Sequence, residues 1–594
     1  MSIPRPEHPQ PQFFRPTWLN LNGTWTFDFD FGKSGLERGL HRATALPRAI
    51  TVPFCPEAAL SGVAHTDFIE AMFYQRNVTV PAEWQGLPRI LLHFGAVDYH
   101  AQIYVNGELV CRHSGGSTPF TADLTGRVQA GQTFSLTVAV QDNTRSGAQG
   151  VGKQSMPYAS AGCSYTRVTG IWQTVYLEAT QDLALVACRC VPDFDGSRFV
   201  LTPTFTREQR GAALTVTAKA DGAAVASRTV PAVSGVPVAL DIPAARPWSP
   251  DSPFLYDLEY TVTRPDGSEA DRVQSYAGLR KINVEGNRIL LNNRPIFLRM
   301  VLDQGFYPDG IWTAPSAQAL ENDIRLSMAC GFNAARLHQK VFEPLFHYYA
   351  DKLGYLTWAE YPSWGMACNG NTSSPAYFES EAHYLREWRA CVERDANHPS
   401  IIAWSPLNET APNDRTPAHT LACYQRFVSD IYDLTHAIDP TRPVNDSSGW
   451  THVKTDIWTT HNYCPDANAL RKSFEAEGKG TVARNRPAVE PPYAGQPFVC
   501  DEWGGFKFIP ADRRDATQAG WGYHGLVIDT PQQLLDKIAE QIDVLVSWPD
   551  CCGYCYTQLT DVEQEQNGVL CYDRTPKAPL DQYAKLFGRT RNDL

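Results

Sequence analysis

The period of the hydrophobic pattern changes at about residue 283, and this change limits the folds that the chain can adopt. Before that point, short runs of alternating apolar and polar residues lie between turn signals, which is typical of β-strands. After it, apolar strand-like runs alternate with amphipathic helical stretches. The chain has 594 residues, too many for a single hydrophobic core. We therefore expect β-sandwich domains followed by a larger α/β domain.

Residues 1–180 have the pattern of an all-β domain. Alternating runs such as TWTFDFD (24–30) and FSLTVAVQD (134–142) recur between turns, and Asn106-Gly107 is a strong hairpin signal. No helical period competes with this alternation. We therefore predict an N-terminal β-sandwich of the jelly-roll type, with a sugar-binding-like character that the resemblance below implies.

Residues 181–282 are also β-patterned, but they are richer in Ala, Val, Thr and Pro. Examples are ALTVTAKADG (213–222) and LYDLEYTVTRPDG (255–267). Turn signals come about every ten residues, and about a hundred residues suits a seven-stranded sandwich. The sequence therefore predicts an immunoglobulin-like β-sandwich in the middle of the chain.

Residues 283–594 are expected to form a (β/α)₈ TIM barrel. Helix candidates lie at 316–331 and 377–397. The expected strands are 295–301, 332–338, 355–361, 401–408, 443–446, 456–461, 497–502 and 552–557. Eight strand–helix units in about 300 residues is the count of this fold, and its active sites lie at the C-terminal ends of the strands.

Two of these strands end in a segment that contains a glutamate. The fourth strand leads into WSPLNE, which ends on Glu409, and the seventh leads into VCDEWG, which contains Glu502. A single such Glu would be interpreted as a solvated or salt-bridged loop residue. Two carboxyl groups on opposite sides of one barrel are what acetal hydrolysis requires, so we predict that both are catalytic. Strand alternation is expected to turn Asp501 away from the site.

Other residues at or near the strand ends are candidates for substrate contact, with packing as the alternative for each. Arg336 could hold the charge of a carboxylate, and Tyr463 could donate a hydrogen bond to the nucleophile. Loop aromatics that could stack on sugar faces are Tyr307, Trp312, Trp364 and Trp548. The full set of substrate-binding candidates is Asp303, Arg336, His338, Glu360, Asn408, His461, Tyr463, Trp503, Trp548 and Tyr556.

Charge and cysteine content exclude some classes of partner. The net charge of −12 argues against nucleic acid and anionic membranes, because both require clustered Lys and Arg. No run of eighteen apolar residues is present, and the start of the chain lacks an export signal, so we expect a cytoplasmic protein. The 15 cysteines are expected to be free thiols, and the Cys552–Cys555 spacing to be buried side chains rather than a metal site. We expect no metal and no cofactor.

Several segments resemble glycoside hydrolase family 2, which includes β-galactosidases, β-glucuronidases and β-mannosidases. RDANHPSIIAWSPLNE (394–409) resembles the acid/base signature of that family, and PFVCDEWGG (497–505) its nucleophile segment. The sandwich segments 94–120, 169–178 and 248–282 contain further similar stretches, so the resemblance covers nearly the whole chain. It implies that Glu409 is the general acid/base, that Glu502 is the nucleophile and that the reaction retains configuration.

The chain departs from this family at places that bear on the sugar. Arg336–Lys340 replaces the usual Arg-x-Ser-His-Tyr-Pro, and Gln339 stands where the His is usual. The Glu-x-His that binds magnesium in large β-galactosidases is missing after Glu360. The stretch Glu565–Val569 lacks the lysine of the Asn-x-Lys with which β-glucuronidases grip the sugar carboxylate, although Lys340 or an arginine could substitute. Tyr556 stands where the family has a tryptophan on the eighth strand.

We therefore expect a retaining, exo-acting glycosidase that releases a terminal non-reducing sugar by double displacement, of β-galactosidase type as first choice. Alternatives are an α-L-arabinofuranosidase or β-galactofuranosidase, then a β-glucuronidase or β-mannosidase. A transglycosylase would use the same two glutamates. A catalytically inactive carbohydrate-binding protein is the rival from another class, but it would be expected to lack one Glu. The expected partner is an oligosaccharide or glycoside substrate. We expect no nucleic-acid or membrane partner, and the sequence allows a homo-oligomer.

Overall fold

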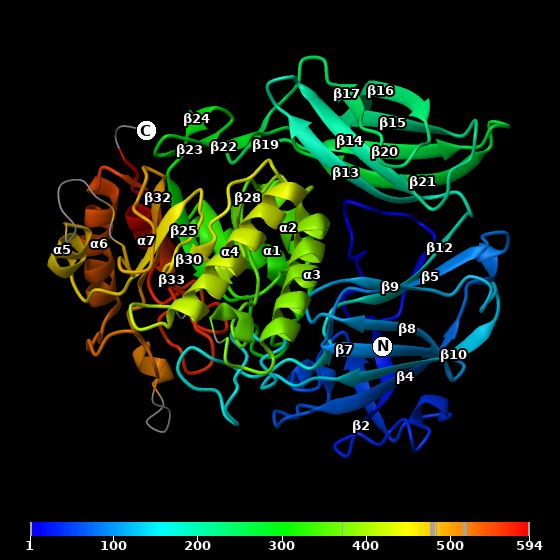
Figure 1. Ribbon diagram of the computed structural model, residues 1–594, viewed down its shortest axis with the longest axis horizontal. Helices are drawn as coiled ribbons and strands as arrows, with labels where there is room; N and C mark the ends of the chain where they lie inside the picture. The colour runs from blue at the N-terminus through cyan, green and yellow to red at the C-terminus, as the bar shows by residue number, and fades with distance from the viewer. Residues whose placement is uncertain are drawn as a thin grey trace.

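The computed structural model describes residues 3–370, 372–410, 412–475, 482, 484–514 and 520–591. Figure 1 shows two β-sandwiches, one blue to cyan and one cyan to green, beside a barrel whose colour runs from green to red. This is the predicted order of a jelly-roll-like sandwich, an immunoglobulin-like sandwich and a TIM barrel. Within the described residues, no helix is long and apolar enough to cross a membrane.

The first sandwich packs a six-stranded sheet (β3-β2-β4-β10-β7-β8) against a four-stranded sheet (β1-β12-β5-β9). Alternation drives this arrangement, since every second residue of β5 is buried between the sheets. Its strands are β1 (Trp18–Asn20), β2 (Gly23–Phe29), β3 (Arg48–Val52), β4 (Ala71–Thr79), β5 (Arg89–Phe94), β6 (Val97–Asp98), β7 (His100–Val105), β8 (Glu108–Ser114), β9 (Phe120–Asp123), β10 (Thr133–Gln141), β11 (Gly170–Ile171) and β12 (Val175–Thr180). The long loop between β10 and β11 runs toward the barrel (Figure 1).

The second sandwich packs a three-stranded sheet (β13-β14-β17) against a four-stranded sheet (β16-β15-β20-β21). These strands are β13 (Leu185–Asp193), β14 (Arg198–Phe205), β15 (Ala213–Ala220), β16 (Ala223–Pro231), β17 (Val238–Asp241), β20 (Tyr256–Thr263) and β21 (Glu269–Ala277). Short strands β18 (Trp248–Ser249), β19 (Ser252–Pro253), β22 (Ile282–Glu285), β23 (Arg288–Leu291) and β24 (Arg294–Pro295) lead to the barrel.

The barrel is a curled parallel sheet of seven strands in the order β28-β27-β26-β25-β33-β32-β31. The strands are β25 (Leu298–Asp303), β26 (Ala334–Leu337), β27 (Leu356–Glu360), β28 (Ile401–Ser405), β31 (Trp458–Asn462), β32 (Phe498–Gly504) and β33 (Cys551–Thr557). The helices around it are α1 (Ala317–Ala329), α2 (Pro344–Leu353), α3 (Tyr377–Asp395), α4 (Ala418–Ile438), α5 (Ala467–Glu475), α6 (Pro531–Ser547) and α7 (Leu580–Phe587).

The fifth strand expected at 443–446 is reduced to isolated pairings. Val444 makes one bridge to Trp404, and β30 (Ser447–Ser448) then pairs with β29 (Leu407–Asn408). Pro443 accepts the N–H of Trp404 at 3.2 Å, but it has no N–H of its own to donate to a ladder. The side chain of Asp446 instead accepts hydrogen bonds from the backbone of the following turn. This short edge places Ser448 beside the end of the fourth strand.

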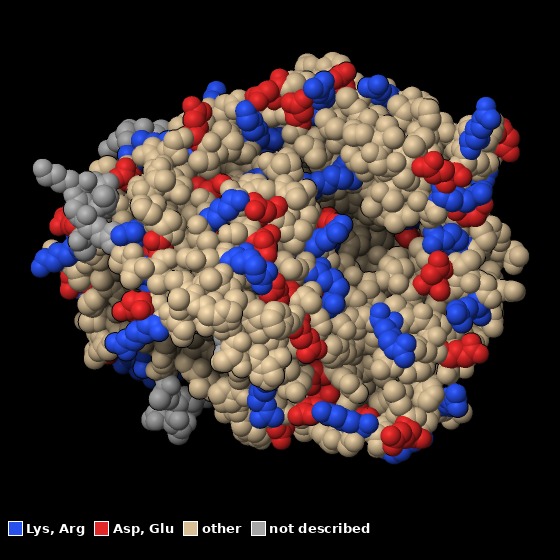
Figure 2. All heavy atoms as spheres, in the orientation of Figure 1, with Lys and Arg blue, Asp and Glu red and all other residues tan. Residues whose placement is uncertain are grey.

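The two sandwiches and the barrel enclose a groove that Figure 2 shows as a hollow with Lys and Arg at its rim. Its volume is about 1020 Å³, and residues of all three domains line it. Arg15 in this groove is buried and binds both Asp271 and Glu178, at 2.8 and 3.0 Å. The groove does not include the glutamates at the barrel strand ends.

The cysteines do not form disulfides. All 15 are free, and Cys551, Cys552 and Cys555 are buried along β33. In the part of the chain that the structure describes, no cysteine belongs to a group close enough to hold a metal ion. Burial raises the pKa of the Cys551 thiol to about 12, so this side chain is an unreactive thiol in the barrel wall.

Candidate active site

Glu409 follows β29 at the C-terminal end of the fourth strand. Its backbone adopts a left-handed conformation with φ of 46°, and its N–H donates to the carbonyl of Ser448 at 3.0 Å. A non-glycine residue in this region is uncommon and is held there by its surroundings. The side chain remains 17% exposed. The strand end therefore presents a partly open carboxyl group at a fixed position.

Glu502 lies on β32 and is more deeply buried, with 4% of its side chain exposed. Arg336 Nη1 donates to Oε1 at 2.9 Å, and the hydroxyl of Tyr463 donates to Oε2 at 2.5 Å. Burial by itself would raise the pKa of Glu502, but the positive charges of His461, Arg336 and Lys153 outweigh it and hold that pKa well below its usual range. Glu502 is therefore ionised, with one oxygen bound by a cation and the other by a hydroxyl.

The two glutamates face each other across a short gap. One oxygen of Glu409, one oxygen of Glu502 and one ring nitrogen of His461 all lie within 4.8 Å of one another. Retaining glycosidases hold their carboxyl groups about 5–5.5 Å apart, whereas inverting enzymes need about 6.5–9.5 Å to admit a water molecule. The gap between these two residues suits direct attack by one carboxylate.

His461, on β31, lies between the two glutamates. Its Nδ1 is 2.6 Å from Oε1 of Glu409, and its Nε2 is 3.3 Å from Oε1 of Glu502. Burial lowers the pKa of His461, but the nearby carboxylates of Glu502, Asp501 and Glu409 raise it above its ordinary value overall. The carboxyl groups on either side therefore favour the imidazolium form of His461.

Replacing His461 with Gln should make any turnover at this site more sensitive to acid. The positive charge of His461 contributes to the lowered pKa of Glu502, so its loss raises that pKa. A carboxylate can attack only in its ionised form, so if Glu502 is the attacking group the acidic limb of the kcat/KM profile should move to higher pH. The measurement is kcat/KM against pH for both proteins. An unchanged acidic limb would contradict this electrostatic role.

Arg336, on β26, is fully buried and organises the base of the site. Its Nε donates to Glu360 at 2.9 Å and its Nη2 to the side-chain oxygen of Asn408 at 2.6 Å. His338 approaches the same guanidinium at 3.0 Å. Burial raises the pKa of Glu360 to about 7, even though Arg336 opposes this shift. The guanidinium thus connects the ends of the second, third, fourth and seventh strands.

Glu409, His461 and Glu502 form the one candidate cation site among the residues that the structure describes. The hydrogen bond between His461 and Glu409 and the charge pairing of His461 with Glu502 account for their closeness without an ion. We therefore treat the cluster as a carboxylate pair bridged by imidazole.

Some sequence candidates lie away from this cluster because alternation puts them on the outer face of the barrel wall. On β25, Met300 and Leu302 belong to the interior core, whereas Val301 packs against the helices. Asp303 lies two residues after Val301, so its side chain points to the same side of the strand. Its carboxylate accepts the N–H of Gly305 at 2.8 Å. The expectation that Asp303 contacts substrate is therefore corrected.

The aromatic candidates on the last strands are corrected for related reasons. Trp503 and Tyr556 pack on each other with ring centroids 5.2 Å apart, and Tyr556 also contacts Phe587 of the outer helix α7. The next residue, Thr557, faces the site instead, with its hydroxyl 3.1 Å from that of Tyr463. Trp548 caps the C-terminus of α6 just before β33 begins, so it lies at the opposite end of the barrel.

Asp501 was expected to point away from the site, but it does not. Pairing between β32 and β33 shifts in register between Cys500 and Trp503, which breaks the simple alternation of side chains. Both Asp501 and Glu502 consequently face His461, and Asp501 accepts a hydrogen bond from Ser448 at 2.6 Å.

Sequence reasoning missed Ser448 and Thr557, since neither a bulge nor a shortened fifth strand leaves a clear sequence signal.

The family assignment comes from three matches along the chain. The protein family described as "Glycosyl hydrolases family 2, TIM barrel domain" matches residues 282–592, which is more than half of the sequence. The chain belongs to glycoside hydrolase family 2. The sugar binding domain of the same family matches residues 19–180, and a further family 2 domain matches residues 199–280. This family 2 protein is accordingly a glycosidase.

Several proteins to which this chain is similar are β-glucuronidases. One from Paenibacillus borealis is 26% identical over 453 residues, which are 72% of this chain and 72% of that protein. One from Felis catus is 25% identical over 472 residues, covering 71% of this chain and 67% of that protein. The solved β-glucuronidase of Ruminococcus gnavus in complex with D-glucuronic acid has a TM-score of 0.77 at 19% identity, covering 97% of this chain and 99% of that one.

These relatives do not support the first choice of a β-galactosidase. That choice rested on the missing lysine after Glu565. The family 2 relatives named here are β-glucuronidases, not β-galactosidases. At 19% identity the solved structure establishes the family 2 fold alone. The sugar must therefore be argued from the residues of this chain.

Proposed function

We propose that this protein is a retaining, exo-acting glycosidase of the β-glucuronidase type, which removes a terminal uronic acid. The observation that carries the reaction type is the gap of less than 4.8 Å between oxygens of Glu409 and Glu502. Support for the sugar comes from the curated relatives, which are named as β-glucuronidases over about 70% of the chain.

In the first step, a carboxylate oxygen of Glu502 forms a bond to the anomeric carbon. The bond from that carbon to the leaving oxygen breaks, and Glu409 gives its proton to the departing group. Arg336 and Tyr463 each bind one oxygen of Glu502, so they hold it in the orientation for attack. The product of this step is a glycosyl ester on Glu502.

In the second step, Glu409 removes a proton from water, and the water oxygen attacks the same carbon from the face that the leaving group vacated. The ester bond to Glu502 breaks, and the sugar leaves with its original configuration. Because His461 binds Glu409 at 2.6 Å, it can stabilise the negative charge on Glu409 once the proton has been given away.

Terminal neutral sugars are the second candidate, and one observation favours them. The stretch Glu565–Val569 contains no lysine. Instead, Glu565 accepts hydrogen bonds from Tyr165 and from Asn567, so this part of the barrel is acidic.

The test is a panel of 4-nitrophenyl glycosides assayed with the full chain. It comprises the β-glucuronide, β-glucoside, β-galactoside, β-mannoside, α-L-arabinofuranoside and β-galactofuranoside. We expect kcat/KM for the β-glucuronide to exceed that for the β-glucoside by at least about 100-fold, since the two differ only in the carboxylate. Higher activity on a neutral glycoside would reject the uronic acid. Proton NMR of the first-formed sugar reports retention or inversion.

A further inference from the structure

The loop between β10 and β11 of the first sandwich docks on the barrel beside the active site. The N–H groups of Val151 and Gly152 both donate to the carbonyl of Trp364, at 2.8 and 3.3 Å. Gly152 has φ of 59°, and a Cβ there would lie 2.4 Å from the carbonyl oxygen of Gln339. Only glycine permits this close approach, so the backbone next to Lys153 is held against the barrel.

Lys153 follows directly on this docked backbone. Its carbonyl accepts the N–H of Tyr165 at 2.7 Å, and its side chain lies with the ammonium 4.0 Å from the centre of the Trp364 ring. The residue is 3% exposed. Within the described residues, the ammonium makes no hydrogen bond and no ion pair. A buried cation without a hydrogen-bonded anion is costly, so this one is expected to have a ligand.

The other buried lysines of the described chain differ in this respect. Lys340 donates to the carbonyls of Gly305 and Trp312, at 2.6 and 2.7 Å. Lys577 donates to the carboxylate of Asp561 at 2.6 Å. Lys340 is therefore engaged in structure and does not replace the missing family lysine. Of the three buried lysines in the described chain, Lys153 is the one whose ammonium donates no hydrogen bond.

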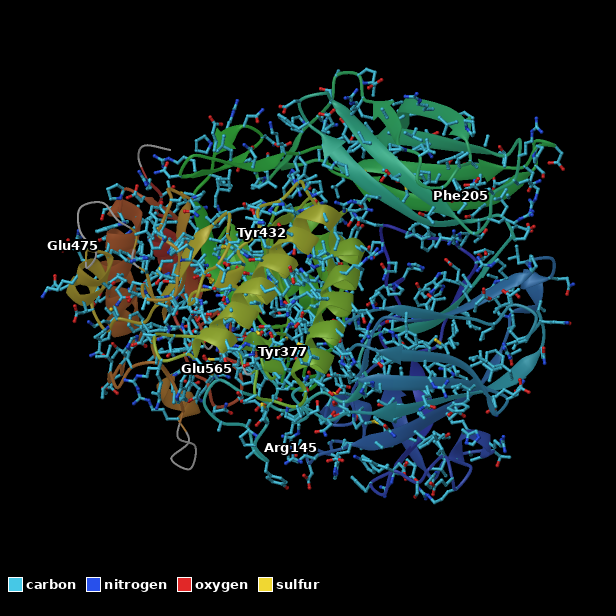
Figure 3. The ribbon with its side chains drawn as sticks, viewed as in Figure 1. Arg145, Phe205, Tyr377, Tyr432, Glu475 and Glu565 are labelled. Atoms are coloured by element: carbon cyan, nitrogen blue, oxygen red, sulfur yellow. The ribbon has the colours of Figure 1, made fainter. Side chains whose placement is uncertain are left out.

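The position of Lys153 relative to the reacting groups follows from Trp364. The indole of Trp364 donates to the carbonyl of Asn408, the residue before Glu409, at 3.1 Å. The ammonium therefore lies next to the acid/base segment. Its charge lowers the pKa of Glu502 and of Glu565, and the carboxylates of Glu565, Glu502 and Glu409 raise the pKa of Lys153 in turn. In Figure 3, Glu565 lies at the lower edge of the barrel, where the loop of the first sandwich also passes.

We propose that Lys153 binds the carboxylate of the terminal uronic acid, so that a residue of the first sandwich supplies the charge that the Glu565–Val569 stretch of the barrel lacks. This inference rests on the proposed function, since a neutral sugar offers no carboxylate to bind. The three donors of an ammonium suit the carboxylate of such a sugar. Lys153 would then be a specificity-determining residue rather than a member of the carboxylate pair.

The test compares Lys153→Met with the wild type on 4-nitrophenyl β-D-glucuronide and β-D-glucoside. Removing one partner of a buried charge pair typically lowers binding by at least about 30-fold. We therefore expect the ratio of kcat/KM for the glucuronide to kcat/KM for the glucoside to fall by that factor or more, because the lost influence of Lys153 on Glu502 lowers both constants alike. Lys153→Arg keeps the charge and should recover part of the glucuronide activity. Arg145→Gln is the matched control, because it removes an exposed cation from the same loop.

The two hypotheses fail in different ways. If the wild type prefers a neutral glycoside, the proposed function fails and the assignment of Lys153 fails with it. If the wild type prefers the glucuronide but Lys153→Met loses equal activity on both substrates, only the Lys153 assignment is overturned. If Lys153→Met has low activity, inhibition constants for D-glucuronic acid and D-glucose provide a second measurement. The glucuronic acid constant should rise in Lys153→Met, whereas an unchanged ratio of the two constants would reject the proposal. Thermal unfolding confirms that each variant is folded.

Discussion

Replacing Glu502 with Gly should lower turnover by at least about 10⁴-fold, the scale on which removal of a covalent nucleophile acts. The variant loses the oxygen that bonds to the anomeric carbon in the proposed mechanism, and Arg336 loses the carboxylate that it binds at 2.9 Å. The fold should persist, because Arg336 keeps Glu360, Asn408 and the carbonyl of Asp501 as partners. The measurement is kcat on the preferred glycoside of the panel, with thermal unfolding as the check on folding.

Azide distinguishes a lost nucleophile from a damaged site. In Glu502→Gly, azide can occupy the vacated space and attack the anomeric carbon while Glu409 still protonates the leaving oxygen. For a β-glycoside, the product should be the α-glycosyl azide, identified by NMR. Asp501→Asn is the neighbouring control, since it removes an adjacent carboxylate that also faces His461. Recovery of a β-glycosyl azide from Glu502→Gly would show that another residue is the nucleophile.

The positions of the two glutamates were more predictable than the residues that line the site around them. Glu409 and Glu502 stand at strand ends, and parallel barrel strands bring their C-terminal ends together whatever the details of packing. Tyr463 and Arg336 follow from the same rule, and both contact Glu502. Hydrophobic alternation likewise indicated all three domains, because a period of two or of about 3.6 residues persists over long segments.

The errors have identifiable physical causes. Asp303 and Tyr556 were placed by their position along a strand, but parity decides which face of the wall a side chain meets. Asp501 was misjudged because a register shift in β32 breaks that parity. Lys153 comes from a loop of another domain, more than 250 residues before Glu409. No periodic pattern encodes that contact, which depends on the docking of Gly152 against the barrel.

Replacing Glu409 with Ala should produce an effect that depends on the leaving group. In the proposed mechanism Glu409 protonates the departing oxygen, and such assistance contributes about 10²–10⁴-fold. An alkyl or sugar aglycone needs this proton, so its kcat/KM should fall by that factor. A 2,4-dinitrophenyl glycoside leaves as a stable anion, so its first step should be nearly unchanged. The measurement is kcat/KM for a series of aglycones of different pKa.

The same variant should accumulate the glycosyl ester on Glu502. Without Glu409, water is not activated for the second step, so a dinitrophenyl glycoside should give a burst of phenol equal to the enzyme present, followed by slow turnover. Azide needs no base, and it should restore turnover by attacking the ester from the open face, giving the β-glycosyl azide from a β-glycoside. This outcome is the opposite of that expected for Glu502→Gly, so the pair assigns both roles. An equal loss on all leaving groups would mean that Glu409 acts through the position of His461, which it binds at 2.6 Å, rather than by proton transfer.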